Sequence, residues 1–151
     1  MDKETLPANP IGFDALLGLE LLDCTDELVT ARLVVRDELL QPFGLVHGGV
    51  IASIAETLAS VGTAVVVVPQ GNAAMGLSNQ TSFLRPIDSG TIHARAVRRH
   101  SGRTTWIWDV EITDDDGRPA SRSRRARSAA TGACRSPTAT AAEPESTEDR
   151  G

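Results

Sequence analysis

Apolar residues recur along the chain in two patterns, one typical of strands and one of a buried helix. Residues 48–64 are apolar on every face, which in a globular chain indicates a helix enclosed by other structure. A short helical segment is predicted over 10–17. Apolar and polar positions alternate, as in half-buried strands, over 19–21, 29–35, 74–84, 91–99 and 104–113. Turn-forming residues separate these strands at 24–27, 86–90, 100–103 and 114–117.

These elements predict an α+β domain in which an antiparallel sheet wraps around a single long helix. In the stretch 104–113 the side chains of Trp106, Trp108, Val110 and Ile112 share one face. We expect this face to pack on the buried helix.

The end of the chain breaks the pattern. A last strand is expected over 119–130, yet this stretch is rich in arginine, serine and alanine and has no large apolar side chain. Burying one unpaired arginine costs several kcal/mol, so a core strand is not expected here. Residues 131–151 lack periodicity and apolar bulk and are predicted to form a disordered tail, which leaves 1–130 as the domain.

Two hypotheses address this atypical last strand. One is a change of reading frame near Arg118, which intact-mass analysis and resequencing of the gene would refute if both support this C-terminus. The other is a phosphate- or RNA-binding patch, but the arginines lack interleaved aromatic residues and an acidic tail follows them.

Composition narrows the function classes. A chain of 151 residues fits one domain, and a net charge of −5 gives no reason to expect nucleic acid or an anionic membrane as a partner. Cys24 and Cys134 are far apart and have no neighbouring metal-binding residues, so neither a zinc site nor a disulfide framework is expected. Residues 1–10 do not resemble a signal peptide, and we expect a cytoplasmic protein. The sequon at 79–81 is then silent.

The helical stretch also imitates a membrane span, because 48–68 is long and apolar enough to cross a bilayer. Glu56 lies near its middle, however. A carboxylate there costs about 2.5 to 3.5 kcal/mol even on the lenient insertion scale. A core helix of a protein without a membrane partner is the favoured interpretation.

A polar stripe interrupts the apolar helix. Glu56 and Ser60 are one helical turn apart, and Ser53 lies three residues before Glu56 on the same side. A carboxylate within an apolar helix is costly unless it is solvated in a cleft or paired by the fold, and a cleft carboxylate is what general-base or nucleophilic attack requires. The alternative is a glutamate that forms hydrogen bonds in a subunit interface.

The start of the helix offers a second chemical feature. The N–H groups of Gly48 and Gly49 are unpaired there and carry the positive end of the helix dipole, which suits a thioester oxygen that gains negative charge. The glycines could equally serve only a tight entry into the helix. His47 could hold the loop or contact the reacting group, and a lone histidine is more often structural.

These residues resemble the active-site segment of a known family, the acyl-CoA thioesterases of the hotdog superfamily. The similar branch includes 4-hydroxybenzoyl-CoA and 1,4-dihydroxy-2-naphthoyl-CoA thioesterases. The matching segment is Gln41-Pro42-Phe43-Gly44-Leu45-Val46-His47-Gly48-Gly49, followed by Glu56 and Ser60. The resemblance covers roughly residues 10–118 and departs from the family in the last strand.

The resemblance implies a role for each site residue. Glu56 would attack the thioester carbon or activate the water that does, and the Gly48 N–H would polarise the carbonyl. Gln41 and His47 would orient the reacting groups, and Ser60 would position the thioester or the water. The family uses no metal or bound cofactor. Its site lies between the subunits of a homodimer, which we expect to assemble further into a homotetramer.

The resemblance also implies a channel for coenzyme A. Arg85 and Arg103 are plausible phosphate partners, because a guanidinium offers several fixed donors, although each could equally be a solvated surface charge. The expected lining comprises Gly76, Phe83, Leu84, Arg85, Pro86, His100, Ser101, Gly102, Arg103 and Thr104.

The sequence therefore predicts an acyl-CoA thioesterase of hotdog fold that releases a free acid and coenzyme A. An aromatic or medium-length acyl group is expected from the resemblance alone. The alternative is a noncatalytic acyl-CoA binding or regulatory module, which the atypical last strand favours. A hotdog hydratase is disfavoured because its motif needs an Asp and His pair.

Overall fold

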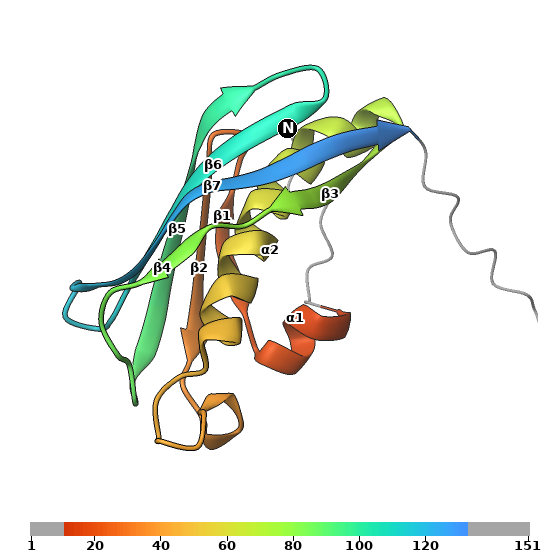
Figure 1. Ribbon diagram of the computed structural model, residues 1–151. Coiled ribbons are helices and arrows are strands. Elements are labelled where there is room, and N and C mark those ends of the chain that lie inside the picture. Colours follow the sequence, from red (N-terminus) through yellow and green to blue (C-terminus); the bar gives the residue numbers. More distant parts are fainter. Residues whose placement is uncertain (1–10, 133–151) are drawn as a thin grey trace, which may run out of the picture.

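A seven-stranded antiparallel sheet curls around one long helix in the computed structural model, which describes residues 11–132 (Figure 1). The helices are α1 (Gly12–Leu17) and the long α2 (Gly48–Val67), with short 3-10 turns η2 (Asp37–Leu39) and η3 (Val68–Gln70). The strands are β1 (Glu20–Cys24), β2 (Leu28–Val34), β3 (Asn72–Ser78), β4 (Thr81–Phe83), β5 (Thr91–Ser101), β6 (Thr105–Thr113) and β7 (Pro119–Gly132).

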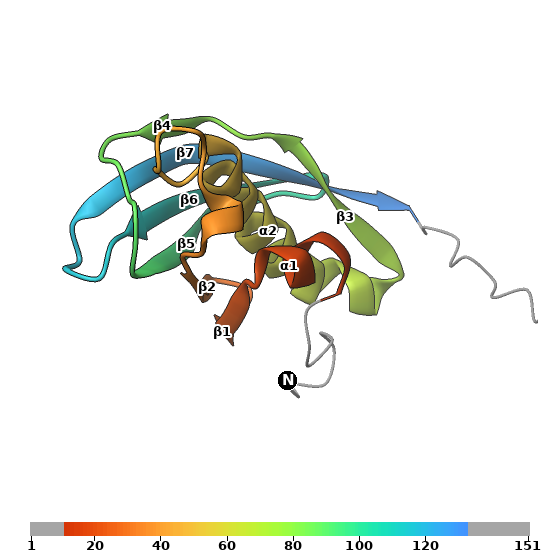
Figure 2. The same ribbon diagram turned by 90° about the horizontal axis from the view of Figure 1, so that it is seen from below.

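The strand order is β1-β2-β5-β6-β7-β3, and β4 also pairs with β7. Strands β3 and β4 lie one after the other along the same side of β7, so β1 and the β3–β4 pair form the two edges of the sheet. In Figure 2, seen from below, the sheet arches over α2 and α1 lies beside the helix. The predicted hotdog architecture, a sheet wrapped around one central helix, is confirmed.

Strand β6 shows why the sheet closes on α2. Its burial alternates along its length, and Trp106, Trp108, Val110 and Ile112 face the core as predicted. Trp108 is fully buried and its Nε1–H donates to the Thr63 hydroxyl at 3.0 Å. A Cβ at Gly62 would lie 2.4 Å from the Trp108 ring, so only glycine allows the helix and this ring to approach so closely.

Helix α2 extends further than the sequence suggested. The apolar helical pattern was predicted over 48–64, with the β-branched valines that follow favouring an end there, yet the helix continues to Val67. Val65 and Val67 are buried, and burial outweighs their weak preference for strands. By length and composition the segment Gly48–Gln70 could cross a membrane, but half of its most apolar window is buried inside the fold.

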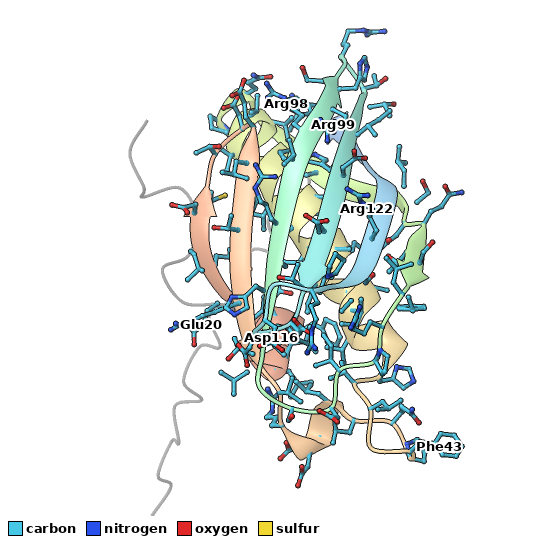
Figure 3. The ribbon with its side chains drawn as sticks, turned by 90° about the vertical axis from the view of Figure 1, so that its left-hand side faces the viewer. Glu20, Phe43, Arg98, Arg99, Asp116 and Arg122 are labelled. Atoms are coloured by element: carbon cyan, nitrogen blue, oxygen red, sulfur yellow. The ribbon has the colours of Figure 1, made fainter. Side chains whose placement is uncertain are left out.

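The last strand corrects the expectation that 119–130 cannot be a core strand. β7 lies inside the sheet, paired with β6 on one side and with β3 and β4 on the other. Its inward positions Ser121 and Ser123 are small and buried, while Arg122 lies on the outer face, 3.7 Å from Glu111 (Figure 3). Small inward side chains thus let an arginine-containing strand close the sheet, although the buried Ser121 hydroxyl finds no partner among the described residues.

The strand also runs two residues past the predicted boundary at 130. The remainder of the predicted tail, residues 133–151, lies outside the described part of the chain.

Candidate active site

Glu56 and Ser60 line a cavity of about 190 Å³ between α2 and β3. The helix contributes Ala59 as well, and the strand side contributes Gly76, Leu77, Ser78 and Asn79. The Glu56 side chain is open to this cavity and forms no ion pair or hydrogen bond with the rest of residues 11–132. The Glu56 carboxylate of one chain therefore lies in an open cavity.

Gly76 brings the strand close to this carboxylate. A Cβ at Gly76 would lie 2.8 Å from Glu56 Oε1 and 3.3 Å from its Cδ. The absence of a side chain on the strand therefore makes room for the carboxylate. Of the predicted channel residues, Gly76 is the one that lines the Glu56 cavity.

Asn79 is a cavity residue that the sequence analysis missed. It interrupts the predicted strand 74–84, which the structure divides into β3 and β4. Its Nδ2 donates to the Ala52 carbonyl of α2 at 2.8 Å, and its Oδ1 accepts from the hydroxyls of Thr81 at 2.7 Å and Ser123 at 3.2 Å. One amide thus ties helix, edge strand and β7 together, one helical turn before Glu56. The sequence did contain one signal for Asn79, namely a polar residue in the middle of a predicted strand.

The start of α2 forms a second cluster of predicted residues. His47 is the N-cap, and its Nδ1 accepts from the Gly49 N–H at 2.9 Å. The Val50 N–H donates to the His47 carbonyl, whereas the Gly48 N–H makes no hydrogen bond with the described residues. The Phe83 ring packs against Gly48, where an added Cβ would lie 3.0 Å from it. Gly48 is therefore the available donor, and Gly49 is not.

This cap also selects one tautomer of the neutral histidine. A neutral imidazole that accepts at Nδ1 carries its proton on Nε2. The histidine therefore acts here through its position at the helix start, with one N–H left to donate outward.

The Gln41 loop precedes this helix start. The Gln41 Oε1 accepts from the Phe43 N–H at 2.9 Å, and a bridge between Leu40 and Val46 closes the loop. Phe43 is 87% exposed and projects away from the sheet (Figure 3). The Gln41 side chain is thereby held by its own loop, with its amide N–H groups unused by that contact.

The two clusters do not meet within one chain. Gly48 and Glu56 are eight residues apart on one helix, which at a rise of 1.5 Å per residue is about 12 Å along its axis. None of Gln41, His47 and Gly48 lines the Glu56 cavity. One chain therefore carries both halves of the predicted site, about two helical turns apart and without a shared cavity.

Comparison with known proteins decides the family. The thioesterase superfamily model matches residues 43–121, which include Gly48, Glu56 and Gly76. The chain belongs to the thioesterase superfamily. The predicted resemblance is thereby confirmed, and the family and the fold make this chain a thioester hydrolase.

Individual relatives support this assignment. The proofreading thioesterase EntH of Cronobacter turicensis is 33% identical over 82% of this chain and 90% of its own length. The 1,4-dihydroxy-2-naphthoyl-CoA hydrolase of Listeria monocytogenes is 31% identical over 70% and 85%. Among solved structures, a mutant thioesterase of Pseudomonas aeruginosa is 35% identical, covers 78% of this chain and 84% of its own, and superposes with a TM-score of 0.73.

The predicted coenzyme A channel of this thioesterase falls into two parts. Phe83 pairs with Ser121 of β7, whereas Thr105, next to the 100–104 hairpin, pairs with Ala129. Eight residues of strand separate these partners, which is about 26 Å at 3.3 Å per residue. The group Phe83, Leu84, Arg85 and Pro86 therefore lies near the start of α2, and the group His100, Ser101, Gly102, Arg103 and Thr104 lies at the opposite end of the sheet.

Proposed function

We propose that this thioesterase hydrolyses an acyl-CoA to the free acid and coenzyme A, with Glu56 as the catalytic carboxylate. The observation that carries the proposal is the open Glu56 cavity, in which an unpaired carboxylate lies beside the Ser60 hydroxyl in a chain of the thioesterase superfamily. The coenzyme A thioester is the substrate class in the name of the Listeria relative.

Glu56 acts on the carbonyl carbon of the thioester, either by direct attack or by activating a water molecule. Both routes need the same carboxylate in the same place. As the carbon becomes tetrahedral, negative charge grows on the carbonyl oxygen, and the Gly48 N–H stabilises that charge. A fixed donor of this kind contributes about 3 kcal/mol to the transition state.

A second copy of the chain completes the site. Gly48 and Glu56 of one chain lie about 12 Å apart along the helix axis, and Gly48 does not line the Glu56 cavity, so we assign them to different sites. In a twofold-symmetric dimer, Glu56 of one copy meets the Gln41 loop and Gly48 of the other, and two equivalent sites form. His47 and Gln41 then orient the carbonyl from the second copy. We further propose that two such dimers form a tetramer.

The same dimer explains the divided channel. Arg85 and Arg103 are both exposed and lie in the two distant groups, so they serve one coenzyme A only if each comes from a different copy. Their guanidinium groups would hold phosphate oxygens of the coenzyme. The proposal includes no metal or bound cofactor, because the chemistry assigned here needs only side chains and water. A cytoplasmic location is also part of the proposal.

The noncatalytic alternative loses its main support in the structure. It was favoured because the last strand seemed unable to close the sheet, whereas β7 pairs along both of its sides. The first experiment below distinguishes this noncatalytic module from the thioesterase.

That experiment measures thiol release from a panel of acyl-CoAs by the native protein and by the Glu56→Ala and Glu56→Gln variants. Glu111→Gln, on the outer face of the sheet, is the matched control. We expect a loss of at least about a hundredfold in the Glu56 variants and none in the control. A folded native protein that binds acyl-CoA without turnover would establish the noncatalytic module instead.

A mixing experiment tests the shared site. Glu56→Ala and Gln41→Ala each inactivate both sites of a homodimer, but a mixed dimer keeps one site with both native residues. Random 1:1 assembly makes half of the dimers mixed, with one intact site of two, so about a quarter of native activity should return. Mixtures that stay as inactive as the separate variants would refute the shared site.

A further inference from the structure

A second cavity continues the Glu56 cavity toward the C-terminal end of α2. It is an open groove of about 620 Å³, and Ser60 lines both cavities. The rest of the groove is lined by Val61, Ala64 and Val68 on the helix side and by Gly71, Asn72, Ala73 and Ala74 at the start of β3. In Figures 1 and 2, β3 runs alongside this half of α2.

The groove follows one row of helix positions. Glu56, Ser60, Ala64 and Val68 are each four residues apart, so each side chain neighbours the next along a row that winds slowly around the helix. At 1.5 Å per residue, the row from Ser60 to Val68 is about 12 Å long. The groove therefore starts beside the reacting carboxylate and leads straight away from it.

The chemistry of the lining is uniform. Among the described side chains, no charged one lines the groove, and Ser60 and Asn72 are the polar ones. A charged group placed there would lose its hydration without gaining a partner, whereas each methylene group placed there would leave water favourably. The lining thus matches an uncharged apolar group attached to the thioester carbonyl.

We infer that this groove holds the acyl group of the substrate and selects an uncharged, medium-length aliphatic chain. The inference rests on the proposed thioester hydrolysis at Glu56 and names the substrate class of that site. An extended chain advances about 1.2 Å per bond, one third of the reach of an extended residue, so about 12 Å accommodates eight to ten carbons. Ala64, halfway along the row, is the specificity-determining residue, because its methyl group leaves the path open.

The test compares butanoyl-CoA with decanoyl-CoA. The native protein should have the higher kcat/KM for decanoyl-CoA. In the Ala64→Leu variant, kcat/KM for decanoyl-CoA should fall at least about tenfold while that for butanoyl-CoA stays within about twofold, because the short chain ends before residue 64. Ala15→Leu, at an exposed position of α1 that does not line the groove, is the matched control and should change neither value.

A second variant covers the case in which Ala64→Leu does not fold. Val68 is 47% exposed at the far end of the groove, so Val68→Ala should leave folding intact and shift the preferred chain length upward. An unchanged chain-length profile in Val68→Ala would overturn the inference.

Other outcomes separate the groove from the reaction. Equal losses on both substrates in Ala64→Leu, with or without dissociation of the dimer in size-exclusion chromatography, would overturn the acyl-groove inference but leave thioester hydrolysis standing. A higher native kcat/KM for 4-hydroxybenzoyl-CoA than for decanoyl-CoA would also overturn it. Absence of thiol release from every acyl-CoA would instead overturn the proposed function itself.

Discussion

Replacement of Gly76 by alanine should separate activity from stability. The new Cβ would lie 2.8 Å from Glu56 Oε1, whereas ordinary contacts begin at 3.4 Å. The carboxylate would therefore have to move by about 0.6 Å. Since a misplacement of about 1 Å at a reacting group can cost a hundredfold in rate, we expect kcat to fall by roughly ten- to hundredfold.

The stability of Gly76→Ala should rise slightly or stay unchanged, in contrast to its activity. The atom that meets the new methyl group is the end of a flexible side chain, so the fold has no need to shift. Glycine within a strand is less favourable than alanine by roughly 0.5 to 1 kcal/mol, because it loses more conformational freedom on folding. The thermal midpoint of Gly76→Ala should thus equal or slightly exceed that of the native protein.

The assay is a double-mutant cycle on thiol release and thermal unfolding. If Gly76 acts through Glu56, then Gly76→Ala should cost little further activity when it is added to Glu56→Gln. Full activity of Gly76→Ala would refute the argument that this glycine makes room for the carboxylate. An equal loss in both backgrounds would refute it as well, since the effect would then not pass through Glu56.

Two further predictions concern the core and the thiol. Gly62→Ala places a methyl group 2.4 Å from the Trp108 ring and 2.9 Å from Val29. Alanine is about 1 kcal/mol more favourable than glycine in a helix, but overpacking costs about 1 to 3 kcal/mol. We therefore expect the free energy of unfolding to fall by about 1 kcal/mol. An unchanged urea midpoint would contradict this. Burial raises the pKa of Cys24 from about 9 to about 11, which disfavours the reactive thiolate. In a Cys134→Ser variant, modification of the Cys24 thiol at pH 8 should be about a hundredfold slower than that of free cysteine. Its rate should rise about tenfold per pH unit. A rate equal to that of free cysteine would contradict the raised pKa.

Periodicity predicted the sheet and helix well because burial imposes it directly. The alternating Trp106 and Trp108 face of β6 had no place except against an apolar helix, and the side of that helix covered by the sheet is apolar because it is buried there. The helix end was predicted less well. Local preference for strand structure in the valine run is weak compared with the burial of Val65 and Val67.

The site was predictable only where its residues share one element or one family motif. Glu56 and Ser60 are one helical turn apart, so their common face followed from spacing alone. Their neighbours across the cavity, Gly76 in β3 and Asn79 just after it, come about twenty residues later, and no local pattern gives the register that brings them to Glu56. Gly76 was predicted as a site residue from the family resemblance, whereas Asn79 was identified only from the structure.

The atypical strand β7 is connected to this site. Its Ser123 hydroxyl donates to Asn79 Oδ1, and Asn79 Nδ2 donates to the Ala52 carbonyl, one turn of α2 before Glu56. An apolar residue at 123 would leave the Asn79 carbonyl oxygen with Thr81 alone. Ser123, one of the small polar residues that made the strand unlike a core strand in the sequence, is thus used by its neighbour Asn79. The main reason for invoking a reading-frame change, the apparent lack of a last core strand, therefore no longer holds for the stretch up to Ser123.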